Sequence, residues 1–123
     1  MTIIEAINRI DSLKPNNYTQ EEKIAWLSTL DGNIKKEIID THEVADDITF
    51  NGYDADTALD TVLLVPAPYD DIYVKWLEAQ IDYTNGETNR YTNSMIMYNT
   101  AHSAFARYYN RNNMPKGHNF KFF

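Results

Sequence analysis

Apolar residues recur at helical spacing at the start of the chain. The sequence Thr-Ile-Ile-Glu at positions 2–5 fits a capping box, in which a threonine and a glutamate satisfy free backbone N–H groups at a helix start. Isoleucines then follow at steps of three or four, and Pro15 would end the element. The pattern therefore predicts a first helix between these two signals. Its apolar stripe is Ile3, Ile4, Ile7 and Ile10.

A second and longer helix is predicted from another capping box, Thr-Gln-Glu-Glu at positions 19–22. The apolar residues that follow are three or four positions apart, and they stay in phase across Gly32. A glycine weakens a helix interior by ~1 kcal/mol relative to alanine. We therefore expect one helix, weakened at this point, that ends at about Thr41. Its stripe is Ile24, Leu27, Leu30, Ile34 and Ile38.

The third and fourth helices are predicted to form an antiparallel hairpin with a short turn. Asp70 or Asp71 begins the third helix, because acidic residues stabilise a helix N-terminus, and Gly86 suits the position just after its end. The fourth helix runs from about Thr88 to Asn112. Its heptad-like stripe is Tyr91, Met95, Tyr98, His102, Phe105 and Tyr109. The residues that we expect to be largely buried in this hairpin are Trp76, Leu77, Met95, Tyr98 and Phe105.

The middle of the chain, about residues 43–69, shows no helical period. Residues 61–65 are β-branched or apolar, and Pro66 and Pro68 stop the run. This pattern predicts a short strand or extended arm, with a possible partner strand around residues 48–50. Two such strands alone would be marginal in water, so helices or a neighbouring subunit must cover them.

The predicted fold class is mainly α: a small bundle of about four helices, with a long C-terminal helical hairpin and a short extended, β-like arm in the middle. A chain of 123 residues has room for one modest core. We therefore expect a single helical domain over residues 1–112, which includes the irregular arm, followed by a C-terminal tail over residues 113–123.

Charged residues are distributed unevenly along the chain. All 18 Asp and Glu lie between Glu5 and Glu87, where 6 Lys and Arg leave a balance of −12. Residues 88–123 carry no acid and 5 Lys and Arg, a balance of +5. Copies of such a chain could attract each other head to tail. This distribution suits a component of an assembly better than an enzyme.

The composition excludes several classes of site. The chain has no cysteine, and therefore no disulfide, thiolate metal site or cysteine nucleophile. No apolar run approaches the ~18 residues of a membrane span, and the first residues lack the basic segment of a signal peptide. We expect a protein without membrane contact that is made and used in a cytosol-like compartment.

The histidines form no recognisable metal or catalytic pattern. His42 is followed by Glu43, but no second histidine comes four residues later, so the zinc-protease pattern fails. His102 lies on the stripe of the fourth helix, where a packed, hydrogen-bonded histidine is the simpler interpretation, and His118 lies in the tail. We predict no catalytic residue, no metal site and no cofactor, and thus no enzyme.

Asp54, Asp56 and Asp60 superficially suggest a calcium-binding loop. The later glycine and the bidentate glutamate of such a loop are missing at the required spacing, so a solvated acidic loop is the favoured interpretation. The serines have no nucleophile-elbow glycines around them, and no glycine-rich phosphate loop is present in the sequence.

The tyrosine-rich fourth helix carries Arg90, Arg107 and Arg111, and such a surface could stack on single-stranded nucleic acid. Five positive charges beside a segment at −12 are a weak basic footprint, however. Core packing and subunit contact explain the tyrosines better, because each supplies apolar area and a polar tip. We expect no sequence-specific binding to nucleic acid.

The C-terminal tail should leave the fourth helix, because Pro115 follows Met114. Three phenylalanines and a lysine end the chain, which would be an unusual apolar cluster if freely solvated. The tail could fold back onto its own helices, dock into a neighbouring subunit or another protein, or be disordered. The candidate interface residues are Phe120, Lys121, Phe122, Phe123, Lys116, Arg107 and Arg111.

Several stretches together resemble a known family. They are residues 64–73 (LVPAPYDDIY), 77–83 (LEAQIDY), 85–87 (NGE), 91–95 (YTNSM), 104–109 (AFARYY) and 37–42 (EIIDTH). The sequence is similar, over roughly residues 19–112, to head–tail connector or neck adaptor proteins of tailed bacteriophages and prophages of Gram-positive hosts.

This resemblance implies a small, mainly α-helical structural protein of the virion, assembled in the cytoplasm of the host bacterium. Such proteins form a homo-oligomeric ring beneath the portal and join the capsid to the tail, so the implied partners are other copies, the portal protein and the next neck or tail protein. The family has no catalytic residues or cofactor to carry over. The alternatives are another small phage morphogenesis factor, for tail completion or head closure, and a helical regulatory module that binds a protein.

Overall fold

The computed structural model describes residues 1–42 and 49–113, and this part of the chain is mainly helical. The four α-helices are α1 (Ile3–Leu13), α2 (Gln20–Glu37), α3 (Ile72–Thr84) and α4 (Thr88–Asn112). Two short 3-10 helices, η1 (Ile39–Thr41) and η3 (Tyr69–Asp71), follow α2 and precede α3. The predicted small, mainly α-helical bundle is therefore confirmed.

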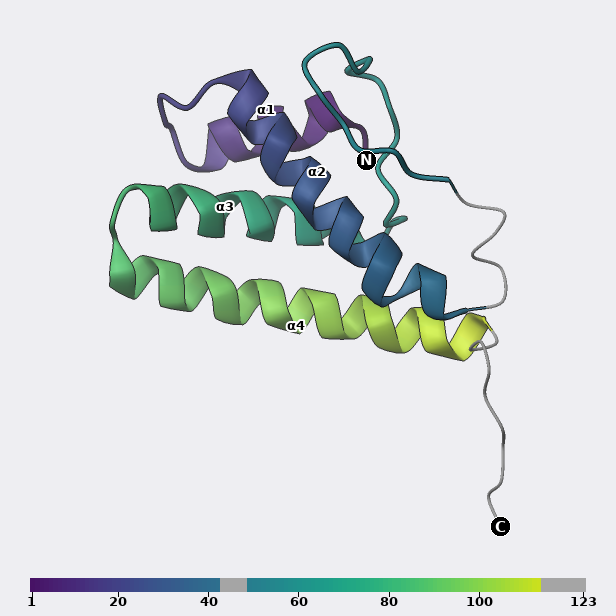
Figure 1. Ribbon diagram of the computed structural model, residues 1–123. Coiled ribbons are helices and arrows are strands. Elements are labelled where there is room, and N and C mark those ends of the chain that lie inside the picture. Colours follow the sequence, from purple (N-terminus) through teal and green to yellow (C-terminus); the bar gives the residue numbers. More distant parts are fainter. Residues whose placement is uncertain (43–48, 114–123) are drawn as a thin grey trace.

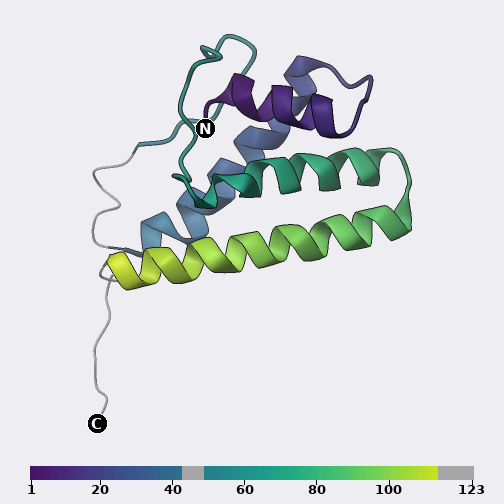
Figure 2. The same cartoon turned by 180° about the vertical axis from the view of Figure 1, so that it is seen from behind.

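The helices are arranged around α3, which contacts α1, α2 and α4 (Figure 1). Helices α3 and α4 form the predicted antiparallel hairpin, and Gly86 in the turn between them has a positive φ of 75°. Helix α1 lies on the opposite side of α3 from α4, and α2 runs obliquely across α3 so that its C-terminal end reaches the end of α4 (Figures 1 and 2). Among the described residues, no helix packs against the outward side of α4.

Both predicted capping boxes are present. The Thr2 side chain accepts a hydrogen bond from the Glu5 N–H (3.3 Å), and the Glu5 carboxylate accepts one from the Thr2 N–H (3.0 Å). Thr19 and Glu22 make the same reciprocal pair, at 3.1 and 3.3 Å. A cap of this kind contributes ~1 kcal/mol to helix stability.

Helix α2 ends at Glu37, four residues before the predicted end at Thr41. The chain turns into η1 at this point because side chains compete for the backbone carbonyl of Ile38. The Thr41 hydroxyl donates to that oxygen at 2.6 Å, and Nδ1 of His42 lies 2.6 Å from it. Such local side-chain hydrogen bonds offer the backbone an alternative to another helical turn.

The predicted strand pair in the middle of the chain is not confirmed. Residue 48 lies outside the described residues, and residues 49 and 50 form no strand. The stretch around Val62 lies instead against the N-terminus, through one isolated antiparallel bridge to Thr2. The Leu63 N–H donates to the Met1 carbonyl at 2.9 Å, and the Ile3 N–H donates to the Thr61 carbonyl at 3.0 Å. The stretch is therefore stabilised by hydrogen bonds to the N-terminal residues, and not by a second strand in the middle of the chain.

One hydrophobic cluster joins all four helices and the stretch that contains Leu63 and Val65. Leu77, Tyr98 and Phe105 are buried in it, as predicted. The prediction was wrong for Trp76 and Met95, which are only half-buried. Indole is large and has a polar N–H, so it often packs at the edge of a core. No helix within the described residues is both long and apolar enough to cross a membrane.

Candidate functional site

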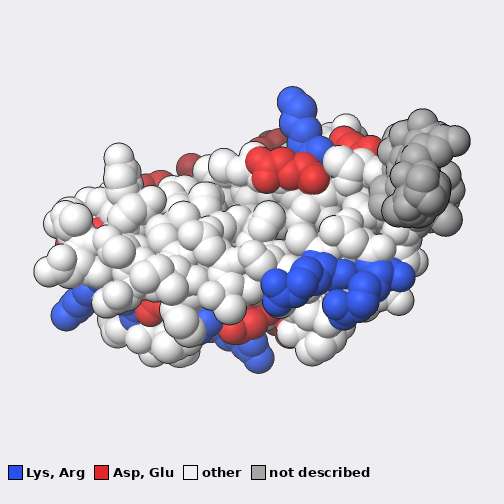
Figure 3. Space-filling view, turned by 90° about the horizontal axis from the view of Figure 1, so that it is seen from below, with Lys and Arg blue, Asp and Glu red and all other residues white. Residues whose placement is uncertain are grey.

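Helix α4 has one packed face and one open face. Its packed face contributes Tyr98, Phe105 and Tyr109 to the core. Burial beside Glu37 raises the pKa of Tyr98 to about 12, because both the apolar surroundings and the nearby carboxylate disfavour the phenolate. The open face is the one seen from below in Figure 3, and much of it is white, with Lys and Arg side chains gathered toward one end.

The open face of α4 combines apolar, neutral polar and basic side chains. Ile96 and Met97 are 57% and 51% exposed, which is unusual for large apolar residues. The middle of the face is hollowed by an open groove of about 410 Å³. The residues that line the groove are Ile96, Asn99, Thr100, Ser103 and Arg107. Helix α4 contains no acidic residue, so nothing on the helix itself neutralises its arginines.

Two of the predicted interface residues, Arg107 and Arg111, lie on α4 one helical turn apart, and both are exposed. Neither forms an ion pair with any residue that the structure describes. Lys116 and the terminal cluster lie outside the described residues, so the structure places only part of the predicted interface. That cluster is Phe120, Lys121, Phe122 and Phe123.

The acidic loop that contains Asp54, Asp56 and Asp60 lies on the other side of the molecule from α4 (Figures 1 and 2). All three aspartates are exposed. The Asp54 carboxylate accepts hydrogen bonds from the Asp56 N–H at 2.9 Å and the Thr57 hydroxyl at 3.2 Å, so it shapes the turn. Within residues 1–42 and 49–113, no group of three or more His, Asp or Glu is arranged to hold a metal ion.

A buried carboxylate on α2 connects three segments. Asp31 is fully buried and accepts hydrogen bonds from the hydroxyls of Tyr53 and Tyr73, both at 2.6 Å, and from the Leu64 N–H at 3.1 Å. Burial raises the pKa of Asp31, and these three donors oppose the rise. The carboxylate thus joins α2 to α3 and to the irregular segment between them.

The sequence contains a signal for the burial of Asp31, which the list of apolar residues on α2 does not include. Asp31 lies four residues after Leu27 and three before Ile34, so it falls in phase with the apolar stripe of α2. A carboxylate at such a position must either break the helix face or find buried donors. The donors come from distant tyrosines, which no local pattern identifies.

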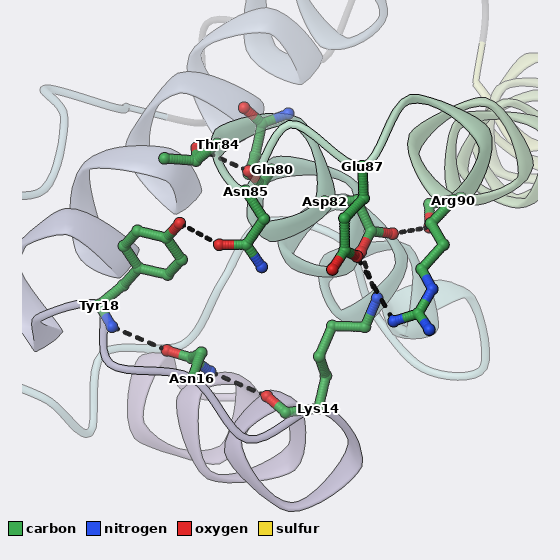
Figure 4. Close-up of polar contacts among 10 residues, drawn as sticks. Lys14, Asn16, Tyr18, Gln80, Asp82, Thr84, Asn85, Glu87 and Arg90 are labelled. Atoms are coloured by element: carbon green, nitrogen blue, oxygen red, sulfur yellow. Dashed lines mark hydrogen bonds and ion pairs between the residues drawn. The ribbon is translucent and has the colours of Figure 1, made fainter.

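A second buried carboxylate, Asp82 on α3, lies where the end of α1 meets the hairpin (Figure 4). It pairs with the ammonium group of Lys14 and accepts a hydrogen bond from the Ser94 hydroxyl at 2.6 Å. An open hollow of about 300 Å³ adjoins this cluster. The carboxylate therefore joins the end of α1 to both helices of the hairpin.

His42 joins the end of α2 to the end of α4. It is buried, and its Nε2 lies 2.8 Å from the Asn110 side-chain oxygen, while its ring packs edge-on against Tyr109 at 4.6 Å. His102 is half-buried beside Tyr98, with 5.8 Å between the ring centroids, and His118 lies outside the described residues. The two described histidines therefore take part in packing on α4.

Comparisons with known protein families, with curated proteins and with solved structures found no match to the chain. The candidate site is therefore assigned from the burial, contacts and charges of the described residues alone. Asp31, Asp82 and His42 each have hydrogen-bond partners within the molecule, whereas Arg107 and Arg111 on α4 and the aspartates of the acidic loop are exposed and form no ion pair with a described residue. These two surfaces are therefore the candidate interaction surfaces of the molecule.

Proposed function

We propose that the protein is a structural component of a tailed-phage virion, a head–tail connector adaptor that assembles as a ring beneath the portal. The observation that carries this proposal is the separation of charge between two open surfaces. Asp54, Asp56 and Asp60, which are all exposed, lie on one side of the molecule, and helix α4, which contains no acidic residue, lies on the other.

A ring subunit needs two different surfaces, since each copy contacts one neighbour on one side and the next neighbour on the other. Opposite charges on these surfaces favour one orientation and disfavour the reverse. An acidic surface that faces the central channel would also repel DNA and let it pass without binding. The net charge of −7 agrees with this role.

The resemblance to connector adaptors, which covers roughly residues 19–112, supports the same proposal. Several of the stretches that carry the resemblance form the α3–α4 hairpin and the turn before it. Under this proposal the protein presents to its partners the open face of α4, the helix that contains residues 91–95 and 104–109. Its partners would be other copies, the portal protein and the next neck or tail protein.

The gene neighbourhood provides the first test. Portal, capsid and tail-tube genes beside the gene for this chain would support the proposal. A neighbouring repressor or toxin gene, with no virion genes nearby, would instead favour a regulatory module that binds a host protein.

Co-sedimentation provides the direct test. The purified full chain is mixed with DNA-filled heads that contain the portal of the same phage, or with isolated tails, and each mixture is separated on a density gradient. We expect the chain to move with the heads. Movement with tails alone would identify a tail-completion factor, and movement with neither would refute a place in the neck.

A further inference from the structure

We propose that the open face of α4 in one copy docks onto the acidic loop of a second copy, head to tail. The basic end of α4 is defined here as Arg107 and Arg111, and the acidic patch as Glu5, Asp54, Asp56 and Asp60. This contact rests on the proposed function and deepens it, because it names the two surfaces through which copies would meet.

The basic end is suited to an acidic protein partner. Arg107 and Arg111 are separated by about 6 Å along the helix axis, as residues one turn apart are. Arginine presents several donors in a planar fork that fits carboxylates, and it is enriched in protein interfaces. The groove that ends at Arg107 begins at the exposed side chain of Ile96, so apolar area borders the charges. A partner here would cover both kinds of surface.

The acidic patch is assembled from two segments that are far apart in the sequence. The Ile4 N–H donates to the Leu59 carbonyl at 3.0 Å, which holds the start of α1 beside the loop. Glu5 and Asp60 each follow one of these two residues in the chain, and both are exposed. Hydrogen bonds from Thr2 lower the pKa of Glu5, so this carboxylate stays ionised.

The placement of the two surfaces determines the geometry of the contact. The loop lies beside α1 at the top of the molecule in Figure 1, whereas α4 lies at the bottom, and Figure 2 agrees. Two different surfaces on opposite sides make a heterologous contact, which continues from copy to copy until a ring closes or a filament grows. A symmetric contact between two basic ends would instead bring like charges together.

A second copy fits the basic end better than nucleic acid does. Residues 1–87 carry a balance of −12, so a polyanion that approaches α4 must also approach a strongly acidic molecule. The same imbalance favours another copy, because its acidic patch supplies the missing counter-charges. Such an interaction weakens as salt is added, since exposed charges are screened.

The test exchanges the charges on the two surfaces of the full chain. One variant is Arg107→Glu/Arg111→Glu, and the other is Asp56→Lys/Asp60→Lys. Neither aspartate side chain accepts a hydrogen bond from a described residue, so the turn shaped by Asp54 should be kept. The size distribution of each protein, and of the two variants mixed, is measured by sedimentation velocity at low and high salt.

We expect the wild-type chain to associate at low salt. The association constant of each variant alone should be lower by about tenfold or more, because like charges then face each other. The mixture should recover association, since the reversed surfaces complement each other. The matched control, Lys36→Glu/Lys75→Glu, makes the same change in net charge as the arginine variant at two sites outside both defined surfaces and should associate as the wild type does.

A wild-type chain that stays monomeric at low salt would overturn the proposal. So would a mixture that fails to recover association while both variants keep the wild-type melting temperature. Strong binding of a single-stranded oligonucleotide at the basic end, lost in the arginine variant, would show that the face serves nucleic acid instead. Head binding without self-association would refute only this inference, whereas self-association without head or tail binding would refute only the proposed function.

Discussion

The hydroxyl of Tyr73 can be removed without changing the shape of the core, so Tyr73→Phe isolates the contribution of one buried polar group. The side chain is fully buried. Its hydroxyl donates to the Asp31 carboxylate at 2.6 Å and accepts from the Val65 N–H at 2.7 Å. Phenylalanine keeps the ring and its packing, and the variant therefore loses two hydrogen bonds while it creates almost no cavity.

The expected cost follows from what each partner loses. The Val65 N–H has no other hydrogen bond to a described residue, and Val65 is fully buried. A buried group left unsatisfied costs about 1–3 kcal/mol. A hydrogen bond to a carboxylate contributes about 1.5–3 kcal/mol. Allowing for relaxation, we expect Tyr73→Phe to lower the free energy of unfolding by about 3 kcal/mol, a large part of the total for a domain of this size.

Tyr53→Phe provides the matched control. Tyr53 donates to the same carboxylate at 2.6 Å, but it is only half-buried and its hydroxyl holds no backbone N–H. We expect this variant to cost about 1.5 kcal/mol, since one charge-assisted hydrogen bond is lost. The difference between the two variants measures the contribution of the Val65 N–H and of deeper burial.

The assay is urea unfolding followed by tryptophan fluorescence and circular dichroism, with the slope against denaturant checked in each variant. A change in midpoint at constant slope reports stability alone. If Tyr73→Phe unfolds within about 0.5 kcal/mol of the wild type, the usual range for surface changes, the hydroxyl is not a buried link. A larger cost for Tyr53→Phe than for Tyr73→Phe would also contradict the argument.

Four other outcomes are expected. His42→Ala should destabilise the protein by about 2 kcal/mol in the same assay, because the ends of α2 and α4 lose a buried hydrogen bond and an aromatic contact; an unchanged midpoint would show that this link is weak. Trp76→Ala should cost about 3 kcal/mol, since the variant loses a half-buried ring and the indole N–H bond to the Trp26 carbonyl (2.8 Å), and a wild-type melting curve would refute that placement. Above pH 10 the tyrosines of the unfolded chain ionise, while Tyr98 in the folded protein, with its pKa raised to about 12, stays protonated. The contribution of Tyr98 to the free energy of unfolding is therefore fully present below pH 10 and is lost as the pH rises toward 12. Tyr98→Phe should make this alkaline loss shallower by up to about 1.4 kcal/mol per pH unit, and identical slopes would contradict the burial of the phenol. We expect no metal site, so EDTA, calcium and zinc should leave the melting temperature of the wild type unchanged. A metal ion that bound only the folded state would raise the melting temperature by mass action.

Local patterns were sufficient for the helices. The capping boxes at Thr2 and Thr19 satisfy backbone groups within three residues of themselves, so they act without help from the rest of the chain. Helix α4 matches its predicted extent because its boundaries follow from the turn at Gly86 and from a long, regular stripe. The outward position of Arg107 and Arg111 follows from that same stripe.

Long-range partners could not be read in the same way. The stretch at Val62 looked like a strand that needed a nearby partner, but it lies against Thr2, some 60 residues earlier. The donors of Asp31 come from Tyr53 and Tyr73, at separations of 22 and 42 residues. The residue spacing within one segment does not specify such a long-range contact, because the contact depends on how whole helices pack against each other. The terminal aromatic cluster stays a prediction, since it lies outside the described residues.

The contact between the first three residues and the stretch around Val62 has a consequence for the order in which the chain folds. The α3–α4 hairpin closes a turn of a few residues, whereas this contact closes a loop of about 60, which costs ~2 kcal/mol more in chain entropy. Contacts between close neighbours in the sequence form sooner than distant ones. We therefore expect the hairpin to form first and the N-terminal contact last. In native-state hydrogen exchange, the amides of Ile3 and Leu63 should open before those in the middle of α3.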